Sequence, residues 1–133
     1  MKNSLVSIII RTKNEERWIG LCLEQIKKQT YKNYEIILVD SLSDDKTVDK
    51  AKRCGVDNVV TISDYKPGKA INIGIEASKG KFIVILSAHC LPINKNWLQE
   101  LVEEINSDYQ IAGVYGKQVP MDFSSNEDKR DLL

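Results

Sequence analysis

The sequence predicts an α/β fold in which a mainly parallel β-sheet is flanked by helices. Short apolar runs alternate along the chain with amphipathic segments of helical period. Within the runs, apolar residues follow one another without polar interruptions, which is typical of strands buried on both faces of a parallel sheet. Regular alternation of such strands with helices favours parallel strand–helix–strand units.

Five apolar runs predict the strands of the sheet. Most are rich in β-branched residues, which favour extended backbone, and the third is the weakest. The region from Gln118 to Leu133 shows no period that predicts an element. The predicted strands are Val6–Ile10, Ile36–Val39, Val59–Ile62, Phe82–Leu86 and Ile111–Tyr115.

Four amphipathic segments predict the helices. Residues that favour helix starts or ends flank each segment. We expect Glu15 and Glu16, and likewise Asp44 and Asp45, to lie in first turns, where the helix dipole favours negative charge. The predicted helices open at Asn14, Ser43, Pro67, and Asn94 or Asn96, and the second and third end at Gly55 and Gly80.

Composition indicates one globular domain, residues 1–133, and argues against several classes of protein. Apolar residues make up 42% of the chain and charged residues 29%, as in ordinary globular proteins. Nineteen basic residues balance nineteen acidic ones, so nucleic acid is not an expected partner. Cys22, Cys54 and Cys90 form no CxxC pair, so we expect reduced thiols and no zinc ribbon.

The N-terminal segment gives no targeting signal. The apolar run in MKNSLVSIIIRTKNEER is too short for a signal peptide or a membrane span. We therefore expect a cytoplasmic protein without a transmembrane segment, and peripheral association with the inner face of the membrane stays open.

Polar residues directly follow three of the predicted strands. They form the segments Arg11–Asn14, Asp40–Ser41 and Ser87–His89. In an open parallel sheet the carboxyl ends of the strands share one edge, and ligands bind beyond that edge. The sequence therefore predicts a ligand site assembled from three separate segments.

Asp40 and Lys69 are candidate ligand contacts. Asp40 either caps the turn that follows it or accepts hydrogen bonds from a base or sugar. Lys69 lies in KPGKAINIG, at a positively charged helix start that suits a phosphate or pyrophosphate; the alternative is a solvated lysine. Neither a P-loop nor a GxGxxG fingerprint is present. A nucleophilic role is not expected for Ser87, which lacks a G-x-S-x-G elbow, or for Cys90, because cysteine is more often a small buried residue.

Three ordered segments resemble the N-terminal, nucleotide-sugar-binding half of family 2 glycosyltransferases of the GT-A fold, which is Rossmann-like. The first resembles the opening strand, the Thr-x-Asn-Glu-Glu turn, the first helix and the second strand ending in Asp. The second resembles Asp-Gly-Ser-x-Asp-x-Thr. The third resembles the Gly-Lys-Ala-x-Asn-x-Gly helix, the strand leading to Asp-x-Asp, and the Pro-x-x-x-x-Trp-Leu helix. The segments are VSIIIRTKNEERWIGLCLEQIKKQTYKNYEIILVD, SLSDDKT and GKAINIGIEASKGKFIVILSAHCLPINKNWLQELV.

The resemblance implies an inverting, hexosyltransferase-type transfer of sugar from a nucleotide diphosphate donor, as in polysaccharide biosynthesis. The implied acceptor is a saccharide or a lipid-linked molecule. Asp40 takes the position of the carboxylate that reads the nucleobase. The implied donor-binding residues are Thr12, Lys13, Asp40, Lys69, Ser87, Ala88 and His89.

Ser87 and His89 stand where the family has the two carboxylates of Asp-x-Asp. His89 is expected to bind a divalent ion, Mn²⁺ or Mg²⁺, through its imidazole. Direct contact with the diphosphate and a purely structural role are the alternatives. Arg11 replaces the usual proline and Lys13 a frequent tyrosine, so stacking on the base is expected to be lost.

The family's general base comes from the second half of its domain, and nothing after Gly116 resembles that half. The catalytic residues are therefore unknown, and we expect a truncated, donor-binding part of the domain that is inactive alone. Two alternatives stay open. One is a non-catalytic nucleotide- or phosphosugar-binding module. The other is a nucleotidyltransferase, which would need a glycine-rich basic loop where RTKNEER stands.

Overall fold

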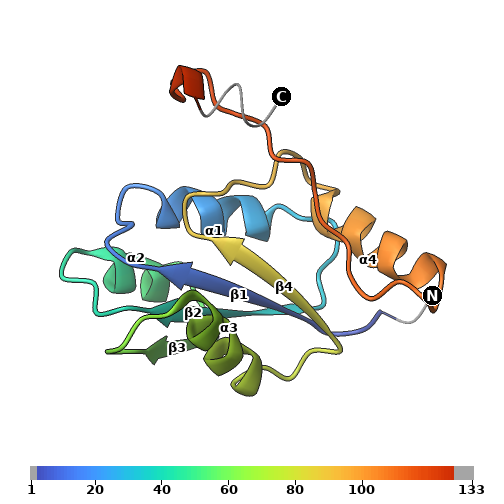
Figure 1. Cartoon of the computed structure of the whole chain (residues 1–133), viewed down its shortest axis with the longest axis horizontal. Coiled ribbons are helices and arrows are strands. Elements are labelled where there is room, and N and C mark those ends of the chain that lie inside the picture. Colours follow the sequence, from blue (N-terminus) through green and yellow to red (C-terminus); the bar gives the residue numbers. More distant parts are fainter. Residues whose placement is uncertain (1–2, 128–133) are drawn as a thin grey trace. The chain divides into compact units, whose positions relative to one another are not determined.

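A computed structural model describes residues 3–127 of the chain. It divides into two compact units, residues 1–99 and 100–133; the prediction of a single domain stays a prediction. In chain order the elements are β1 (Val6–Thr12), α1 (Ile19–Lys27), β2 (Tyr34–Asp40), α2 (Thr47–Arg53), β3 (Asn58–Thr61), α3 (Pro67–Glu76), β4 (Phe82–Ser87) and α4 (Trp97–Ser107) (Figure 1).

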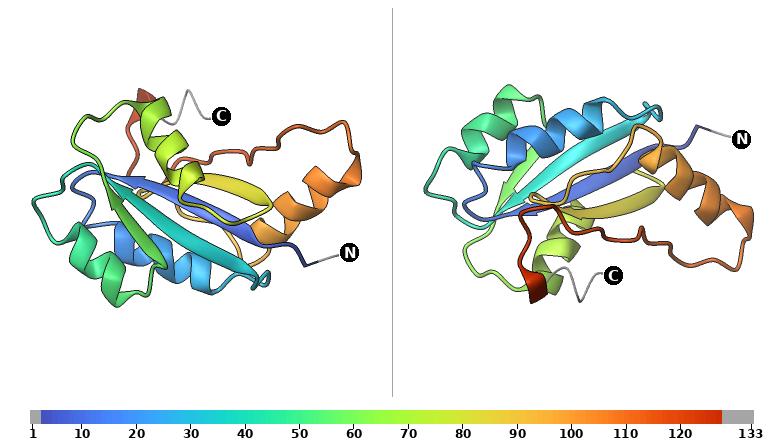
Figure 2. Two further views of the ribbon diagram at one scale, coloured as in Figure 1. Left: turned by 90° about the horizontal axis from the view of Figure 1, so that it is seen from below. Right: turned by 90° about the horizontal axis from the view of Figure 1, so that it is seen from above.

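The first unit is built on a four-stranded sheet with the order β3-β2-β1-β4. Every neighbouring pair of strands is parallel. Helices α1 and α2 lie on one face and α3 lies on the other (Figure 2). This arrangement confirms the predicted α/β fold, in which both faces of the central strands are covered.

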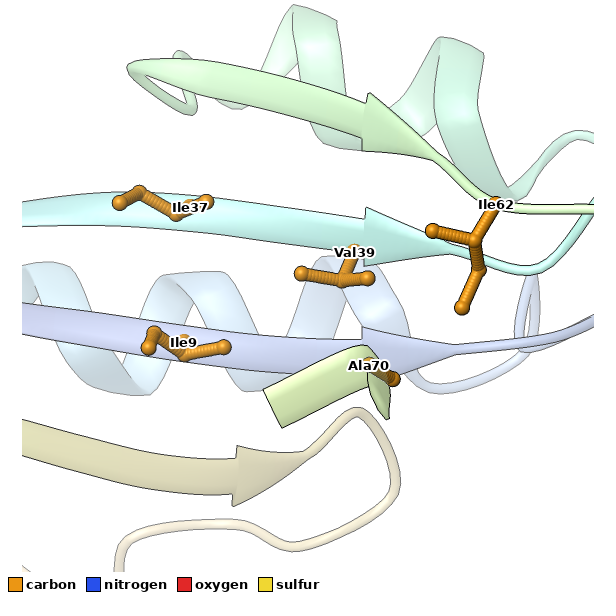
Figure 3. Close-up of a cluster of buried hydrophobic side chains, with 5 residues drawn as sticks. All are labelled: Ile9, Ile37, Val39, Ile62 and Ala70. Atoms are coloured by element: carbon orange, nitrogen blue, oxygen red, sulfur yellow. The ribbon is translucent and has the colours of Figure 1, made fainter. Parts of the chain in front are cut away.

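Helix α3 packs closely on its face of the sheet. Adding a Cβ atom to Gly74 would place it 2.5 Å from Cγ2 of Ile9, so the small residue permits the close approach of helix and strand. The buried apolar side chains of this face form one cluster (Figure 3): Ile9, Ile37, Val39, Ile62 and Ala70.

Helix α1 buries one apolar face, as expected of an amphipathic helix, but it begins later than expected. Ile19, Cys22, Leu23 and Ile26 are all buried. The helix starts at Ile19 rather than after Asn14, whose φ of 52° is left-handed and incompatible with a helix. The expectation that Glu15 and Glu16 lie in its first turn is therefore wrong.

Helix α2 also begins later than predicted, at Thr47. Asp44 and Asp45 precede the helix, so the prediction that they lie in its first turn is wrong. Gly55 has φ 80° and lies just beyond the helix, which confirms it as the residue where the helix ends.

The start of α4 depends on a buried glutamine that no sequence pattern indicates. Gln29 is fully buried, and its Oε1 accepts the amide of Leu98 at 3.0 Å. Its Nε2 donates to the carbonyls of Gln25 and Asn94 at 3.1 and 2.8 Å. The amide of Asn96 also donates to the side chain of Asn94, which agrees with an opening at these asparagines.

The predicted strand Ile111–Tyr115 is wrong. These residues are not in a strand, and the amide of Ile111 closes a local turn with the carbonyl of Asp108. A strand is stabilised by pairing and by burial of one face, whereas the Tyr115 side chain is 95% exposed. No helix within residues 3–127 is long and apolar enough to cross a membrane.

Candidate donor site

The three polar strand ends meet at one edge of the sheet. Parallel pairing places Thr12 of β1 opposite Asp40 of β2, and Arg11 of β1 opposite Ser87 of β4. The sequence prediction that these segments come together is confirmed. Polar residues of β1, β2 and β4 therefore lie next to one another at this edge.

Asp40 is almost fully buried and is engaged in a turn. Its Oδ2 accepts the amide of Ser43 at 2.9 Å, and its Oδ1 accepts the Ser43 hydroxyl at 2.6 Å. Asp40 therefore caps the turn that follows it, which is one of the two roles that the sequence suggests. A carboxylate oxygen has two lone pairs, so each oxygen keeps capacity for a further donor, and the ligand role stays a prediction.

Thr12 carries a buried hydroxyl without a partner. The residue is 6% exposed, and its Oγ1 makes no hydrogen bond within the described part of the chain. An unpaired buried polar group costs about 1–3 kcal/mol. A ligand that reached this hydroxyl beside Asp40 would remove that cost.

The loop after β1 is tied to the loop after β2. Lys13 donates through Nζ to the carbonyl of Leu42 at 2.6 Å, so its amine is engaged within the protein. The backbone amide of Asn14 donates to Oγ of Ser43 at 2.8 Å, and the side-chain Oδ1 of Asn14 accepts the backbone amide of Asp44 at 2.9 Å. These bonds fix the two loops relative to each other before a ligand arrives.

A second set of hydrogen bonds between these loops centres on Asp45 and Thr47. The amide of Glu15 donates to Oγ1 of Thr47 at 2.8 Å, and the amide of Glu16 donates to Oδ2 of Asp45 at 3.1 Å. Oδ1 of Asp45 accepts both the hydroxyl and the amide of Thr47. Burial alone would raise the pKa of Asp45, but these hydrogen bonds outweigh it and lower that pKa.

His89 lies against an acidic side chain of the β1–α1 loop. Its Nδ1 is 3.0 Å from Oε1 of Glu15, and the imidazole is 57% exposed. The preceding Ala88 is fully buried, and the amide of Cys90 donates to the carbonyl of Ser87 at 2.9 Å, which turns the chain after β4. The sequence does not indicate Glu15 as a member of the site, because its pattern there predicts a helix.

A divalent ion fits this edge poorly. Within residues 3–127, no three His, Cys, Asp or Glu side chains are grouped so that they could hold a metal. At the turn after β4, His89 and Glu15 are two possible metal ligands, and they already contact each other. Mn²⁺ and Mg²⁺ prefer several oxygen ligands, and Ser87 supplies a neutral hydroxyl where a carboxylate would serve.

Arg11 places a cation at the same edge. In the sheet register it lies between Val39 of β2 and Ser87 of β4. Its Nε is buried and has no hydrogen-bond partner in the described part of the chain. Leaving a charged donor unsatisfied is more costly than leaving a neutral one, so this nitrogen is suited to an anionic acceptor.

The cysteines near the edge are poor nucleophiles. Burial raises the pKa of the Cys90 thiol; the charge of Glu15 raises it further, and the charge of Arg11 opposes that rise. Burial and nearby Cys90 raise the pKa of Cys22 to about 12. Because the thiolate is the reactive form, these raised pKa values agree with the expectation that Cys90 is not catalytic.

Lys69, like Lys13 and His89, is a predicted site residue that lies at the surface. It lies in the first turn of α3, and its Nζ is 3.3 Å from Oδ2 of Asp64. Both side chains are largely exposed, at 47% and 67%. An exposed pair of this kind is worth little, so Lys69 is free to exchange Asp64 for a phosphate, and its donor role stays a prediction.

Taken together, these observations define an α/β protein with a parallel sheet, in which Arg11, Thr12, Asp40 and Ser87 lie at the carboxyl ends of neighbouring strands. The sequence matches glycosyl transferase family 2 over residues 7–130. The chain therefore belongs to that family, and its sheet and helices match GT-A glycosyltransferase structures.

One relative and two solved structures illustrate the similarity. The Methanococcus voltae dolichyl N-acetyl-alpha-D-glucosaminyl phosphate 3-beta-D-2,3-diacetamido-2,3-dideoxy-beta-D-glucuronosyltransferase is 34% identical, over 85% of this chain and 39% of its own length. The mannosyltransferase PcManGT from Pyrobaculum calidifontis, in complex with GDP-Man and Mn²⁺, has a TM-score of 0.72 at 25% identity, covering 77% of this chain and 32% of its own. Staphylococcus aureus TarS 1–349, in complex with UDP-GlcNAc, has a TM-score of 0.67 at 26% identity, covering 87% and 37%. This chain thus spans less than half the length of each of these proteins.

Proposed function

We propose that this chain forms the donor-binding part of a glycosyltransferase that moves a sugar, with inversion, from a nucleotide diphosphate donor to an acceptor hydroxyl. The observation that carries the proposal is the convergence of Thr12, Asp40 and Ser87 at one edge of the sheet. Family membership and two structural relatives that hold GDP-Man and UDP-GlcNAc support the class of donor.

In this proposal the nucleoside lies over the ends of β1 and β2. The buried Asp40 carboxylate accepts a hydrogen bond from the base or ribose while it keeps its turn with Ser43. Thr12 offers its unpaired hydroxyl beside it. Lys13 acts through the backbone of its loop, because its amine is held by the carbonyl of Leu42.

The diphosphate and sugar lie toward the end of β4. Ser87, Ala88 and His89 supply backbone groups, a hydroxyl and an imidazole there, and Lys69 approaches from the start of α3. The metal-ligand role of His89 stays a prediction. Within residues 3–127, no three His, Cys, Asp or Glu side chains are grouped so that they could hold Mn²⁺ or Mg²⁺, so in this proposal protein groups alone bind the donor.

The acceptor and the catalytic base belong to the proposal as well. We propose a saccharide or lipid-linked acceptor, a role in polysaccharide biosynthesis and a cytoplasmic location, and we assign the general base to a region outside these 133 residues. General-base assistance is worth roughly 10²- to 10⁴-fold. The isolated chain should therefore bind donor and transfer no sugar, and transfer by the purified chain would contradict this assignment.

Calorimetry with a panel of nucleotides tests the proposed function. We expect one nucleoside diphosphate among UDP, GDP, CDP and TDP to bind, with the corresponding nucleotide sugar competing for the same site. Preference for the nucleoside triphosphate together with a sugar 1-phosphate would favour the nucleotidyltransferase alternative. Donor binding without turnover in a lengthened chain would favour a non-catalytic module.

A further inference from the structure

Binding a nucleotide sugar poses an electrostatic problem at this edge of the sheet. A diphosphate brings concentrated negative charge, and the edge already holds the carboxylates of Asp40 and Glu15. Like charges at short range repel strongly where water is partly excluded. Some positive group must therefore face the diphosphate, and this inference rests on the proposed donor site.

Three lysines near the edge are engaged elsewhere. Lys13 and Lys50 donate to the backbone carbonyls of Leu42 and Glu16. Lys69 pairs with the exposed Asp64. Each would have to give up a contact to meet the donor.

Arg11 differs from these lysines. Its Nε is buried and has no acceptor within residues 3–127. The register places it directly beside Ser87, the residue that stands at the first position of the family's acidic motif. In a parallel pair, registered residues project from the same face of the sheet, so Arg11 and Ser87 face the same region. The effect of its charge on the pKa of Cys90 agrees with a position near the turn after β4.

The acidic groups at this turn do not compensate for the missing metal ligands. The carboxylate of Glu15 contacts Nδ1 of His89, and the backbone amide of Glu15 donates to the hydroxyl of Thr47. The described residues thus lack a metal-binding group, and they contain at this edge an arginine, Arg11, whose Nε is buried without a hydrogen-bond partner.

The geometry points to Arg11, in place of a divalent ion, as the group that binds the donor diphosphate. A guanidinium presents up to five donors in a planar fork that matches phosphate oxygens. Arg11 would donate to the diphosphate from beside β4, and Ser87 would add a hydroxyl. In this proposal, the arginine that stands in place of the family's usual proline supplies the positive charge that a metal on the acidic motif would otherwise supply.

The test is calorimetry of the intact 133-residue chain with UDP, GDP, CDP and TDP, each in EDTA and in Mn²⁺. For the diphosphate that binds, the wild-type affinity should differ by less than about 2-fold between the two conditions. Arg11→Met should weaken that affinity roughly 10- to 100-fold. It should change the affinity of the matching nucleoside, which lacks phosphates, by less than about 2-fold.

Matched variants make the result specific. Arg53→Met removes an exposed arginine of α2 and should leave the affinity unchanged. Arg11→Lys keeps the positive charge but loses the planar guanidinium, so its diphosphate affinity should lie between those of wild type and Arg11→Met. Far-UV circular dichroism checks that each variant is folded, and the comparison of EDTA with Mn²⁺ in wild type needs no variant.

Two results would overturn the inference and leave the proposed function standing. One is a gain of more than about 10-fold from Mn²⁺ in wild type that disappears in His89→Ala, which would show a metal site. The other is an unchanged diphosphate affinity in folded Arg11→Met. If none of the four diphosphates binds under either condition, the proposed function itself fails.

Discussion

Nδ1 of His89 lies 3.0 Å from Oε1 of Glu15, although 74 positions separate the two residues in the chain. The contact joins the turn after β4 to the loop after β1. That loop is in turn tied to the start of α2 through Thr47 and Asp45. The three segments that follow the strands are therefore held together by protein contacts alone, so a donor would meet a site that is largely preorganised.

Asp40→Asn should weaken binding of the nucleoside diphosphate while the chain stays folded. A charged acceptor facing a base N–H is worth about 1.5–3 kcal/mol, which corresponds to an affinity loss of roughly 10- to 150-fold. Asp49→Asn is the matched control, because it makes the same chemical change at an exposed carboxylate of α2. Calorimetry and thermal melting should show lost affinity only in Asp40→Asn. Equal affinity in wild type and Asp40→Asn would exclude the base-reading role.

Gln29→Ala should destabilise the fold by about 2–4 kcal/mol. It leaves the carbonyl of Asn94 and the amide of Leu98 without their partner, and each unsatisfied buried group costs about 1–3 kcal/mol. Urea unfolding measures the change in free energy. Gln25→Ala, on the same helix and only partly buried, should change stability by less than about 0.5 kcal/mol. A similar effect of the two substitutions would contradict this role of Gln29.

Gly80→Ala should also be destabilising, by about 1–3 kcal/mol or more. A Cβ atom there would lie 2.5 Å from both the amide nitrogen and Oγ of Ser7, and the backbone has little room to move. Gly20→Ala is the control, because nothing lies within 4 Å of its added Cβ and it is inside α1. We expect that substitution to stabilise the helix by about 0.5–1 kcal/mol. Melting temperatures that move in the same direction for both variants would argue against the steric explanation.

Glu35→Gln should reduce the loss of stability in acid. Burial acts to raise the pKa of Glu35, but hydrogen bonds from Ser7 and the amide of Lys79 outweigh it and hold that pKa below its usual 4.5. A depressed folded-state pKa adds stability that is present above about pH 4.5 and is lost as the pH falls through the folded-state pKa. The melting temperature of Glu35→Gln should therefore fall less steeply below that pH than wild type. Glu24→Gln, which changes an exposed carboxylate of α1, should follow the wild-type curve.

The sheet could be predicted from sequence because its strands are continuous apolar runs, as in Val6–Ile10. The residues at which helices α1 and α2 begin were harder to predict. Asn14 and Asp45 resemble helix caps, but both are used to bond one loop to another. The run Ile111–Tyr115 has strand-like composition, yet strand formation depends on pairing, which composition does not report. The site segments could be found as strand ends, whereas the contact of Glu15 with His89 depends on tertiary structure.

The most direct test of the donor site is amide chemical-shift mapping of the ¹⁵N-labelled chain during titration with the nucleoside diphosphate that binds. The predicted result is a set of concerted shifts at the carboxyl edge, in residues 11–15, 40–43 and 87–90. Residues at the opposite ends of the same strands, Val6, Tyr34 and Phe82, should stay unperturbed. Shifts confined to the opposite edge, or to only one of the three strand ends, would contradict the claim that these segments form one nucleotide-sugar site.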